Sequence, residues 1–339
     1  MGKKKGAGDF FPHDTKKIIE KVGREELIEN LRKMLLVRNF EVRAESAYQQ
    51  GKMGGFFHSY IGQEAVQTAA IQVLGLNHWY STTYRCHALA LLLGENPESL
   101  MAELFGRETG NARGRGGSMH FFTDRLLGGL AIVGGHLAVA AGAAFSIKYR
   151  GVRGQVAICF LGDGAVAQGS FHEALNLASL WSLPCIYVIE NNHWGMGTSV
   201  DRALCVDRLA ENKAPGYKMK GYTVDGMDFF SCYAGFEHVY HEVLDTGRPV
   251  LLEAITESFR GHSISDPGFY RTKEQLNKCK ERDPLILMKK QLIDAKILKE
   301  EQYQTMDKEM RDRVMEAIKF ADGSPWPDPI TLEEDVYAT

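Results

Sequence analysis

Two short polar motifs in this 339-residue chain, each directly after an apolar run, have the residue types to hold a metal ion and a phosphate group. Gly162-Asp163-Gly164 follows the run 155–161, and Asn191-Asn192 follows the run 184–190. A carboxylate and a carboxamide are oxygen ligands that suit Mg²⁺, which completes its shell with phosphate and water. Glycines let the backbone approach a phosphate closely, and the N-terminus of a following helix favours an anion. The two motifs together predict a diphosphate–Mg²⁺ site.

The spacing of these motifs is typical of a strand, a helix and a second strand. Between Gly164 and Asn191 lie residues 165 to 190, which is 26 residues. The two apolar runs indicate buried strands, and residues 165–181 carry apolar side chains at helical spacing. Such a unit brings the carboxyl ends of two parallel strands to one sheet edge, where open α/β sheets bind ligands. Either motif alone is an ordinary turn sequence, so the prediction depends on their combination.

Other polar side chains lie close to the ends of further predicted elements. His262, with Arg260, follows the predicted strand 250–255, where the pair could bind phosphate or act as acid or base. Tyr84-Arg85 offers a hydroxyl and a guanidinium to an oxyanion, and His58 lies in an aromatic stretch. Residues 107–120 are rich in glycine and arginine, which indicates an irregular loop that either binds an anion or only packs closely. Taken singly, side chains of this kind more often have a structural or surface role.

The remaining elements follow from periodicity and from breaks in it. Residues 1–15 are expected to be disordered or loosely attached, and residues 80–85 to form a loop. Helical patterns cover 14–50, 63–74, 87–93, 136–149 and 273–320, and residues 323–329 form a Pro-rich tail.

Composition and charge narrow the class of protein. An apolar content of 44% and a net charge of −3 are typical of a soluble globular chain without general affinity for nucleic acid. The six cysteines have no pairing spacing, which favours reduced thiols in the cytoplasm. The start 3–5 lacks the apolar region of a secretory signal, and the apolar stretch 130–147 carries a histidine and several glycines. We therefore expect no membrane span.

Several motifs in one order carry a resemblance to a known family. They are Gly62-Gln63-Glu64-Ala65, Tyr84-Arg85, Gly116-Gly117-Ser118-Met119-His120, Gly162-Asp163-Gly164-Ala165, Glu190-Asn191-Asn192, Val224-Asp225-Gly226-Met227-Asp228 and Gly261-His262-Ser263. From about Leu31 to Pro284 the chain resembles the alpha subunits of the thiamine-diphosphate-dependent decarboxylating component of 2-oxoacid dehydrogenases. Within that family it looks most like the enzymes that act on pyruvate.

The resemblance implies an α/β thiamine-diphosphate-binding fold, with a mainly parallel sheet flanked by helices and helical additions at both ends. We expect an N-terminal segment over 1–50, the diphosphate-binding domain over 51–272, and C-terminal helices with the Pro-rich tail over 273–339.

The resemblance also implies roles for individual residues, with thiamine diphosphate and Mg²⁺ as cofactors. Asp163 and Asn192 would bind Mg²⁺ through side chains, and Trp194 through its carbonyl oxygen. The cofactor would contact His58, Tyr84, Arg85, Ala131, Val133, Asp163, Gly164, Ala165, Asn192, Trp194, Met196 and His262. Of these, Gly164 and Ala165 would serve the diphosphate and Ala131 and Val133 the aminopyrimidine, all through backbone atoms. His58 and His262 would be the catalytic side chains.

The partners implied by the resemblance are proteins as well as a small 2-oxoacid. A beta subunit would supply the glutamate that starts proton removal, in an assembly of two alpha and two beta chains. The acyl group would pass to a lipoyl group on a dihydrolipoyl acyltransferase core.

Four alternatives remain open. Two lie within the family, an alpha subunit acting on branched-chain 2-oxoacids or on acetoin. The third is a nicotinamide dehydrogenase, although the glycines at 162, 164 and 169 do not give the GxGxxG spacing. The fourth is a non-catalytic paralogue.

Overall fold

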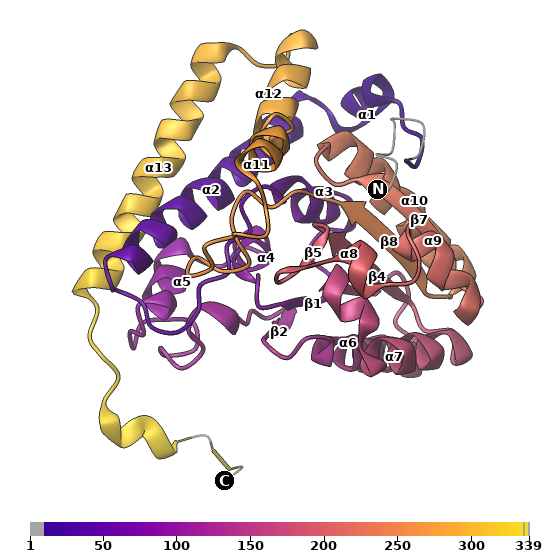
Figure 1. The fold of residues 1–339 in the computed structure, drawn as a ribbon, viewed down its shortest axis with the longest axis horizontal. Helices are drawn as coiled ribbons and strands as arrows, with labels where there is room; N and C mark the ends of the chain where they lie inside the picture. Colours follow the sequence, from indigo (N-terminus) through magenta and orange to yellow (C-terminus); the bar gives the residue numbers. More distant parts are fainter. Residues whose placement is uncertain (1–9, 335, 338–339) are drawn as a thin grey trace.

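A parallel six-stranded sheet forms the centre of the molecule in this computed structural model, which describes residues 10–334, 336 and 337. The strands are β1 (Trp79–Thr83), β2 (Leu126–Leu130), β3 (Ala157–Gly162), β4 (Cys185–Asn191), β7 (Lys220–Asp225) and β8 (Val250–Ile255). They lie in the order β2-β1-β3-β4-β8-β7, and all neighbours in this sheet are parallel (Figure 1). The predicted α/β class is confirmed.

The strand order contains a reversal between β1 and β3. From β1 the chain moves outward to β2, whereas from β3 it moves outward to β4 on the other side. In open α/β sheets, the crevice outside the strand ends at such a reversal is the usual ligand site. Thr83 and Gly162, the last residues of β1 and β3, mark this crevice.

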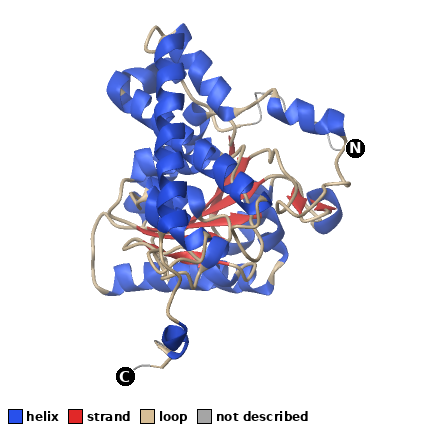
Figure 2. Cartoon of the chain, turned by 90° about the vertical axis from the view of Figure 1, so that its left-hand side faces the viewer, coloured by secondary structure: helices blue, strands red, loops and turns tan. Residues whose placement is uncertain are grey.

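Helices cover both faces of the sheet, because successive strand residues point to opposite faces. Phe160 and Val188 lie in one apolar core, and their neighbours Leu161 and Ile189 lie in the other. The first core includes helices α2 (Arg24–Gln49), α3 (Glu64–Leu74), α4 (His87–Leu92), α5 (Pro97–Leu104), α10 (Phe229–Thr246) and α12 (Pro284–Asp294). The second includes α6 (Gly135–Tyr149), α7 (Gly169–Leu180) and α9 (Leu209–Lys213). Figure 2 shows the strands between these helical layers.

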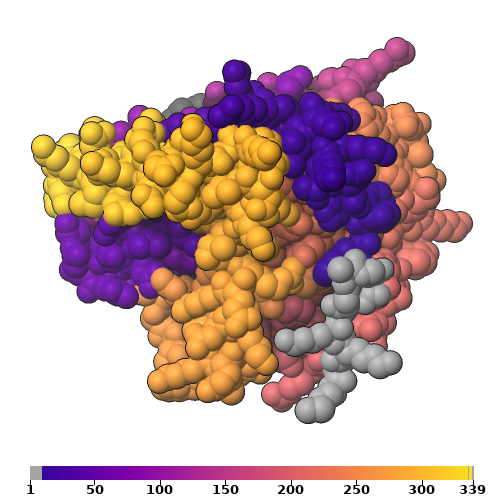
Figure 3. Space-filling view, turned by 90° about the horizontal axis from the view of Figure 1, so that it is seen from above, coloured from indigo at the N-terminus to yellow at the C-terminus, as the bar shows by residue number. Residues whose placement is uncertain are grey.

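The first and last helices of the chain pack on the same side of the molecule. These are α1 (Thr15–Val22), α2, α11 (Lys273–Lys280), α12 and α13 (Glu300–Gly323). Helices α2 and α13 lie side by side, and Figure 3 shows α13 beside the N-terminal segment on one face. Beyond α13 the chain extends away from the body and forms a short 3₁₀ turn, η5 (Pro329–Glu333). Within the described residues, no helix combines the length and the apolar character needed to cross a membrane.

The N-terminal segment is attached to the sheet from Phe11 onward, which corrects the expectation of a loose start; residues 1–9 lie outside the described part. The amide of Phe11 donates a hydrogen bond of 2.7 Å to the carbonyl oxygen of Thr223 on the edge strand β7. Its ring packs against Tyr222 and His238, with ring centroids 5.7 and 4.7 Å away. The side chain of Asp14 then caps the start of α1 by accepting hydrogen bonds from the amides of Lys16 and Lys17. The segment therefore covers an edge of the sheet.

The prediction of a loop over 80–85 is wrong, because β1 extends to Thr83 in the middle of the sheet. Tyr80, Ser81 and Thr82 are fully buried, although two of these three side chains are polar. The strand thus lacks the apolar run by which β3 and β4 are predicted. The sequence pattern also does not predict β7, which begins with an exposed lysine.

Candidate active site

A cavity of about 380 Å³ opens at the carboxyl ends of the strands, where the winding reverses between β1 and β3. All the residues predicted for the cofactor and the metal line it, namely His58, Tyr84, Arg85, Ala131, Val133, Asp163, Gly164, Ala165, Asn192, Trp194, Met196 and His262. They come from six separate parts of the chain, four of which follow the ends of β1, β2, β3 and β4. The fold therefore brings the predicted site residues together, and their roles remain a proposal.

Further residues of the cavity wall are not among the predicted ones. They are Gln63, Thr83, Met119, Leu130, Gly134, His136, Gly162, Glu190 and Gly195. Gln63, Met119 and Glu190 belong to motifs that carry the family resemblance, so their place in the sequence was itself a signal. His136 is a polar residue at the start of an otherwise apolar helix, which is a weaker signal.

Asp163 lies directly after β3 as the first residue of a 3₁₀ turn, η3 (Asp163–Ala167), and its side chain is buried. Burial raises the pKa of its carboxyl to about 6, although backbone hydrogen bonds and the charge of Arg85 act in the opposite direction. A carboxylate that has lost its water in this way is stabilised by a nearby cation.

Asn192 follows β4, and its side-chain Oδ1 accepts a hydrogen bond of 3.1 Å from the Trp194 amide. This contact turns the chain into the antiparallel pair β5 (Trp194–Gly195) and β6 (Thr198–Ser199) beside the cavity. One carboxylate, one carboxamide and a nearby carbonyl match the few protein ligands that Mg²⁺ takes. The described residues hold no group of three or more His, Cys, Asp and Glu side chains suited to a metal. The donor set therefore fits Mg²⁺ shared with a phosphate.

The segment after Asp163 differs from the predicted helix over 165–181. Gln168 has an extended conformation, so η3 ends before it and α7 begins at Gly169. Gly164 closely approaches the β5–β6 pair, since a Cβ built on it would lie 3.6 Å from the Cα of Gly195. Gly164 and Ala165 both line the cavity.

Arg85, two residues beyond the end of β1, is buried and held by backbone carbonyls. Its Nη1 donates to the carbonyl oxygen of Ser59 at 2.6 Å, and its Nη2 to that of His262 at 2.7 Å. These bonds leave a fixed positive charge in the cavity wall, close enough to Asp163 to influence its carboxyl. Such a guanidinium is suited to a phosphate oxygen.

Three aromatic side chains stand together in the cavity wall. The ring of His58 lies 4.4 Å from that of Tyr84 and 5.0 Å from that of His262, between centroids. Burial, followed by the charge of Arg85, lowers the pKa of His58 to about 3 and that of His262 to about 4. Both imidazoles are therefore neutral at pH 7, and His58 Nδ1 has no hydrogen-bond partner among the described residues. They are available to accept a hydrogen bond from a ligand.

Glu190, at the end of β4, is a buried acid of the cavity wall that the sequence reasoning missed as a site residue. Burial raises the pKa of its carboxyl to about 7, against the effect of hydrogen bonds from Tyr60 and Gln67. Tyr60 Oη and Gln67 Nε2 both donate to Oε1 of this carboxylate. These bonds tie the strand end to the segment that carries His58.

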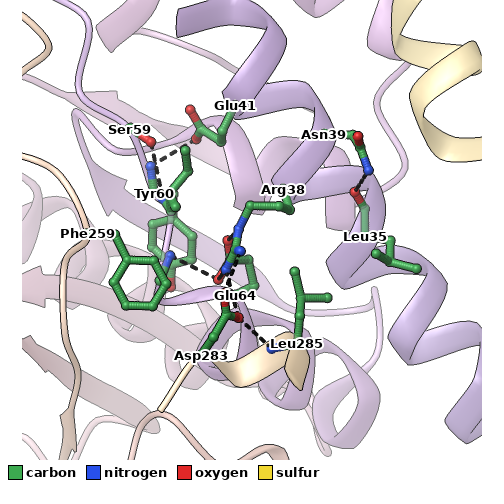
Figure 4. A network of polar contacts seen from close by, with 12 residues as sticks. Leu35, Arg38, Asn39, Glu41, Ser59, Tyr60, Glu64, Phe259, Asp283 and Leu285 are labelled. Carbon is green, nitrogen blue, oxygen red and sulfur yellow. Dashed lines mark hydrogen bonds and ion pairs between the residues drawn. The ribbon is translucent and has the colours of Figure 1, made fainter. Parts of the chain in front are cut away.

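Charged residues outside the cavity wall contact the segment 58–64, which carries His58 (Figure 4). The guanidinium of Arg38 on α2 lies between the carboxylates of Glu64 and Asp283, with contacts of 2.5 and 2.8 Å, and stacks over the ring of Phe259. Glu41 on the same helix accepts a hydrogen bond from the Tyr60 amide at 3.1 Å. Breaking a buried pair of this kind is strongly destabilising, so the segment is held firmly.

The arginines of the loop 107–120 are engaged within the chain. Arg113 forms ion pairs with Glu108 and Glu334 at 2.8 and 3.3 Å, and Arg115 donates to the carbonyl oxygen of Thr331 at 2.8 Å. Of the two predicted alternatives for this loop, the structure favours close packing.

Comparison with known proteins agrees with this geometry. Residues 32–330 match the family described as "Dehydrogenase E1 component". The chain is 42% identical over 316 residues to "Pyruvate dehydrogenase E1 component subunit alpha" of Rickettsia felis, covering 93% of this chain and 96% of that protein. It is 39% identical over 321 residues to the protein of the same name from Rhizobium meliloti, covering 94% and 92%. To "Pyruvate dehydrogenase E1 component subunit alpha-3, chloroplastic" of Oryza sativa it is 41% identical over 333 residues, covering 94% and 77%. The family resemblance predicted from the motifs is confirmed, and the chain belongs to the family of dehydrogenase E1 components.

Proposed function

We propose that this chain is the alpha subunit of an acetyl-transferring pyruvate dehydrogenase, which carries out the oxidative decarboxylation of pyruvate. The observation that carries the proposal is the cavity at the strand reversal, where Asp163, Asn192 and Arg85 meet two neutral imidazoles. The names of relatives about 40% identical over more than nine-tenths of the chain support pyruvate as the substrate.

We assign thiamine diphosphate and Mg²⁺ to this cavity. Asp163 and Asn192, with the carbonyl oxygen of Trp194, would hold Mg²⁺ against the diphosphate. Gly164, Ala165 and Tyr84 would contact the diphosphate with Arg85 and His262, while Ala131 and Val133 would hold the aminopyrimidine and Met196 would support the bent cofactor. When bound, thiamine diphosphate supplies a nucleophilic carbon and an electron sink for decarboxylation.

The catalytic work that we assign to this chain belongs to His58 and His262. Because burial and the Arg85 charge keep both imidazoles neutral at pH 7, each has a free lone pair to accept a hydrogen bond from the substrate. Their contact with each other and with Tyr84 fixes the orientation of the rings.

We further propose that the chain works with a beta subunit, as two alpha and two beta chains, and passes the acetyl group to a lipoyl group of an acyltransferase core. Helices α6 and α7, which pack in the second apolar core, support this proposal because large apolar side chains on and beside them are exposed. Phe145 and Tyr149 on α6 and Trp181 after α7 are 46%, 82% and 46% exposed, and the Phe145 ring packs against both others. A contiguous aromatic surface of this kind marks a protein interface. All six cysteines are free thiols, which agrees with the proposed cytoplasmic location.

The test is dye reduction by this chain purified with its co-purifying partner. Mg²⁺ and thiamine diphosphate are supplied with pyruvate, 2-oxoisovalerate or acetoin in turn. Turnover with pyruvate that disappears when the cofactor is omitted supports the proposal. Preference for either other substrate moves the chain within its family, and no turnover with any substrate, despite a bound partner, contradicts the proposed activity.

A further inference from the structure

His87, the first residue of α4, is a fully buried histidine outside the cavity wall. Its Nδ1 lies 3.1 and 3.2 Å from the two carboxylate oxygens of Glu41, and its Nε2 lies 2.8 Å from the carbonyl oxygen of Ser118. The Oγ of Ser118 also lies 3.2 Å from Nε2, so both ring nitrogens have oxygen partners. It therefore bridges helix α2 and the glycine-rich loop.

Three phenylalanine rings enclose this imidazole. The ring centroids of Phe57, Phe121 and Phe40 lie 5.1, 5.1 and 6.2 Å from that of His87, and all three phenylalanines are buried. The apolar enclosure keeps water from competing for the two hydrogen bonds. If the bridge breaks here, the buried Glu41 carboxylate loses His87 as a partner. Such a loss costs far more folding free energy than it would at the surface.

The Glu41 side of the bridge leads to one wall of the cavity. The same carboxylate oxygen that faces His87 accepts a hydrogen bond from the Tyr60 amide at 3.1 Å. Two residues before Tyr60, the side chain of His58 lines the cavity. The position of Glu41 therefore determines where the His58 segment lies.

The Ser118 side of the bridge leads to a second wall of the cavity. The next residue, Met119, lines the cavity, and the Nδ1 of His120 lies 2.9 Å from the carbonyl oxygen of Gly129. Gly129 is in β2, just before Leu130 and Ala131 of the cavity wall. A shift of the Ser118 carbonyl therefore reaches the backbone to which we assign the aminopyrimidine.

We propose that His87, together with Glu41, is a positioning residue that fixes the separation between these two walls. The proposal rests on the proposed function, because it concerns how the same cavity holds its cofactor and presents His58. Since His87 itself does not line the cavity, it acts only through Glu41 and Ser118.

Two substitutions separate the two halves of the bridge. In His87→Asn, the amide nitrogen takes the place of Nδ1 and keeps the bond to Glu41 but loses Ser118. In His87→Gln, the amide nitrogen takes the place of Nε2, so the bond to Ser118 is kept and the bond to Glu41 is lost. The matched control is His78→Gln, because His78 is also buried but accepts its hydrogen bond from Val156, at the other end of β1.

The experiment uses the assembled enzyme with its partner and measures three quantities: the melting temperature, the Kd for thiamine diphosphate at saturating Mg²⁺, and kcat and KM at saturating cofactor. Binding is followed by protein fluorescence, since Trp194 lines the cavity. We expect His87→Asn to raise the Kd at least tenfold. We expect His87→Gln to lower kcat at least tenfold with a smaller change in Kd, while His78→Gln changes only the melting temperature.

The outcomes are distinguishable. If both His87 variants match His78→Gln in Kd and kcat after assembly, the positioning role is overturned. If neither His87 variant assembles, Glu41→Gln carries the test, because it keeps an acceptor for the Tyr60 amide; a tenfold fall in kcat supports the proposal and an unchanged kcat overturns it. Failure of the unsubstituted enzyme to bind thiamine diphosphate would instead overturn the proposed function.

Discussion

The guanidinium of Arg85 donates a hydrogen bond of 2.7 Å to the backbone carbonyl oxygen of His262, across 177 positions of sequence. The same group holds the carbonyl oxygen of Ser59. One side chain thus fixes the two segments that carry the candidate catalytic imidazoles, besides supplying charge to the cavity.

Arg85→Lys should weaken both functions of this residue. A lysine ammonium is a point charge on a flexible stem and cannot reproduce the planar fork that meets two carbonyls. We expect the Kd for thiamine diphosphate to rise at least tenfold, about 1.4 kcal/mol, and hydrogen exchange to speed up in residues 259–271. Titration calorimetry and exchange mass spectrometry measure these changes. Arg153→Lys, at an exposed position, is the control, and equal behaviour of the two variants would contradict the role given to Arg85.

Asp163→Ala should remove Mg²⁺-dependent cofactor binding and leave the fold intact. With its pKa raised by burial to about 6, the ionised carboxyl opposes folding at pH 7.5 by about 3 kcal/mol without a cation. The alanine variant should therefore melt no lower than the unsubstituted chain in the absence of cofactor. Calorimetric titration and thermal melting test both statements, with exposed Asp201→Ala as the control. Normal cofactor binding by the variant would refute the assignment of the metal site.

Glu103→Gln should destabilise the glycine-rich loop. The buried carboxylate of Glu103, on α5, accepts hydrogen bonds of 2.7 to 3.1 Å from four amides, those of Ala112, Gly114, Gly116 and Gly117. A glutamine has one acceptor oxygen and an NH₂ group that repels the remaining amides, so we expect a loss of about 3 kcal/mol. Urea unfolding measures it, with exposed Glu316→Gln as the control. A loss below about 1 kcal/mol would mean that the loop is held by other contacts.

His136→Gln should make the fold less sensitive to acid. The Nε2 of His136 donates to the carbonyl oxygen of Phe160 at 2.8 Å, and burial lowers the pKa of the ring to about 4. The unfolded chain binds this proton below pH 6.5 and the folded chain only near pH 4, so stability falls as the pH drops through that window, by up to about 3 kcal/mol. Glutamine keeps the donor without the titration. Melting temperatures from pH 7 to pH 4 should fall less for His136→Gln than for exposed His241→Gln, and parallel curves would refute the prediction.

The strands that could be predicted from the sequence are those buried on both faces by apolar side chains. The runs 155–161, 184–190 and 250–255 agree with β3, β4 and β8 to within two residues. β1 was not predictable in the same way, because Ser81 and Thr82 are polar and only the sheet around them accounts for their burial. The edge strand β7 presents exposed and half-buried residues before Thr223, so periodicity alone does not mark it.

The site was predictable where a motif follows a strand, and less so where contacts come from distant helices. Asp163 and Asn192 stand at the ends of neighbouring strands, so local sequence and the rules of parallel sheets bring them together. Glu41, Glu103 and His87 lie on helices whose packing is decided by the whole fold. No local pattern distinguishes these buried polar side chains from solvated ones before the tertiary structure is known.

The backbone hydrogen bond between Phe11 and Thr223 affects how readily the chain aggregates during expression and storage. An uncovered edge strand is a template on which other molecules add strands, the first step toward insoluble aggregates. With its first thirteen residues clipped by a protease, this chain would offer the backbone of β7 to its neighbours. A fusion tag that replaces these residues directly before Asp14 would do the same, so the contact made by Phe11 protects the solubility of the chain.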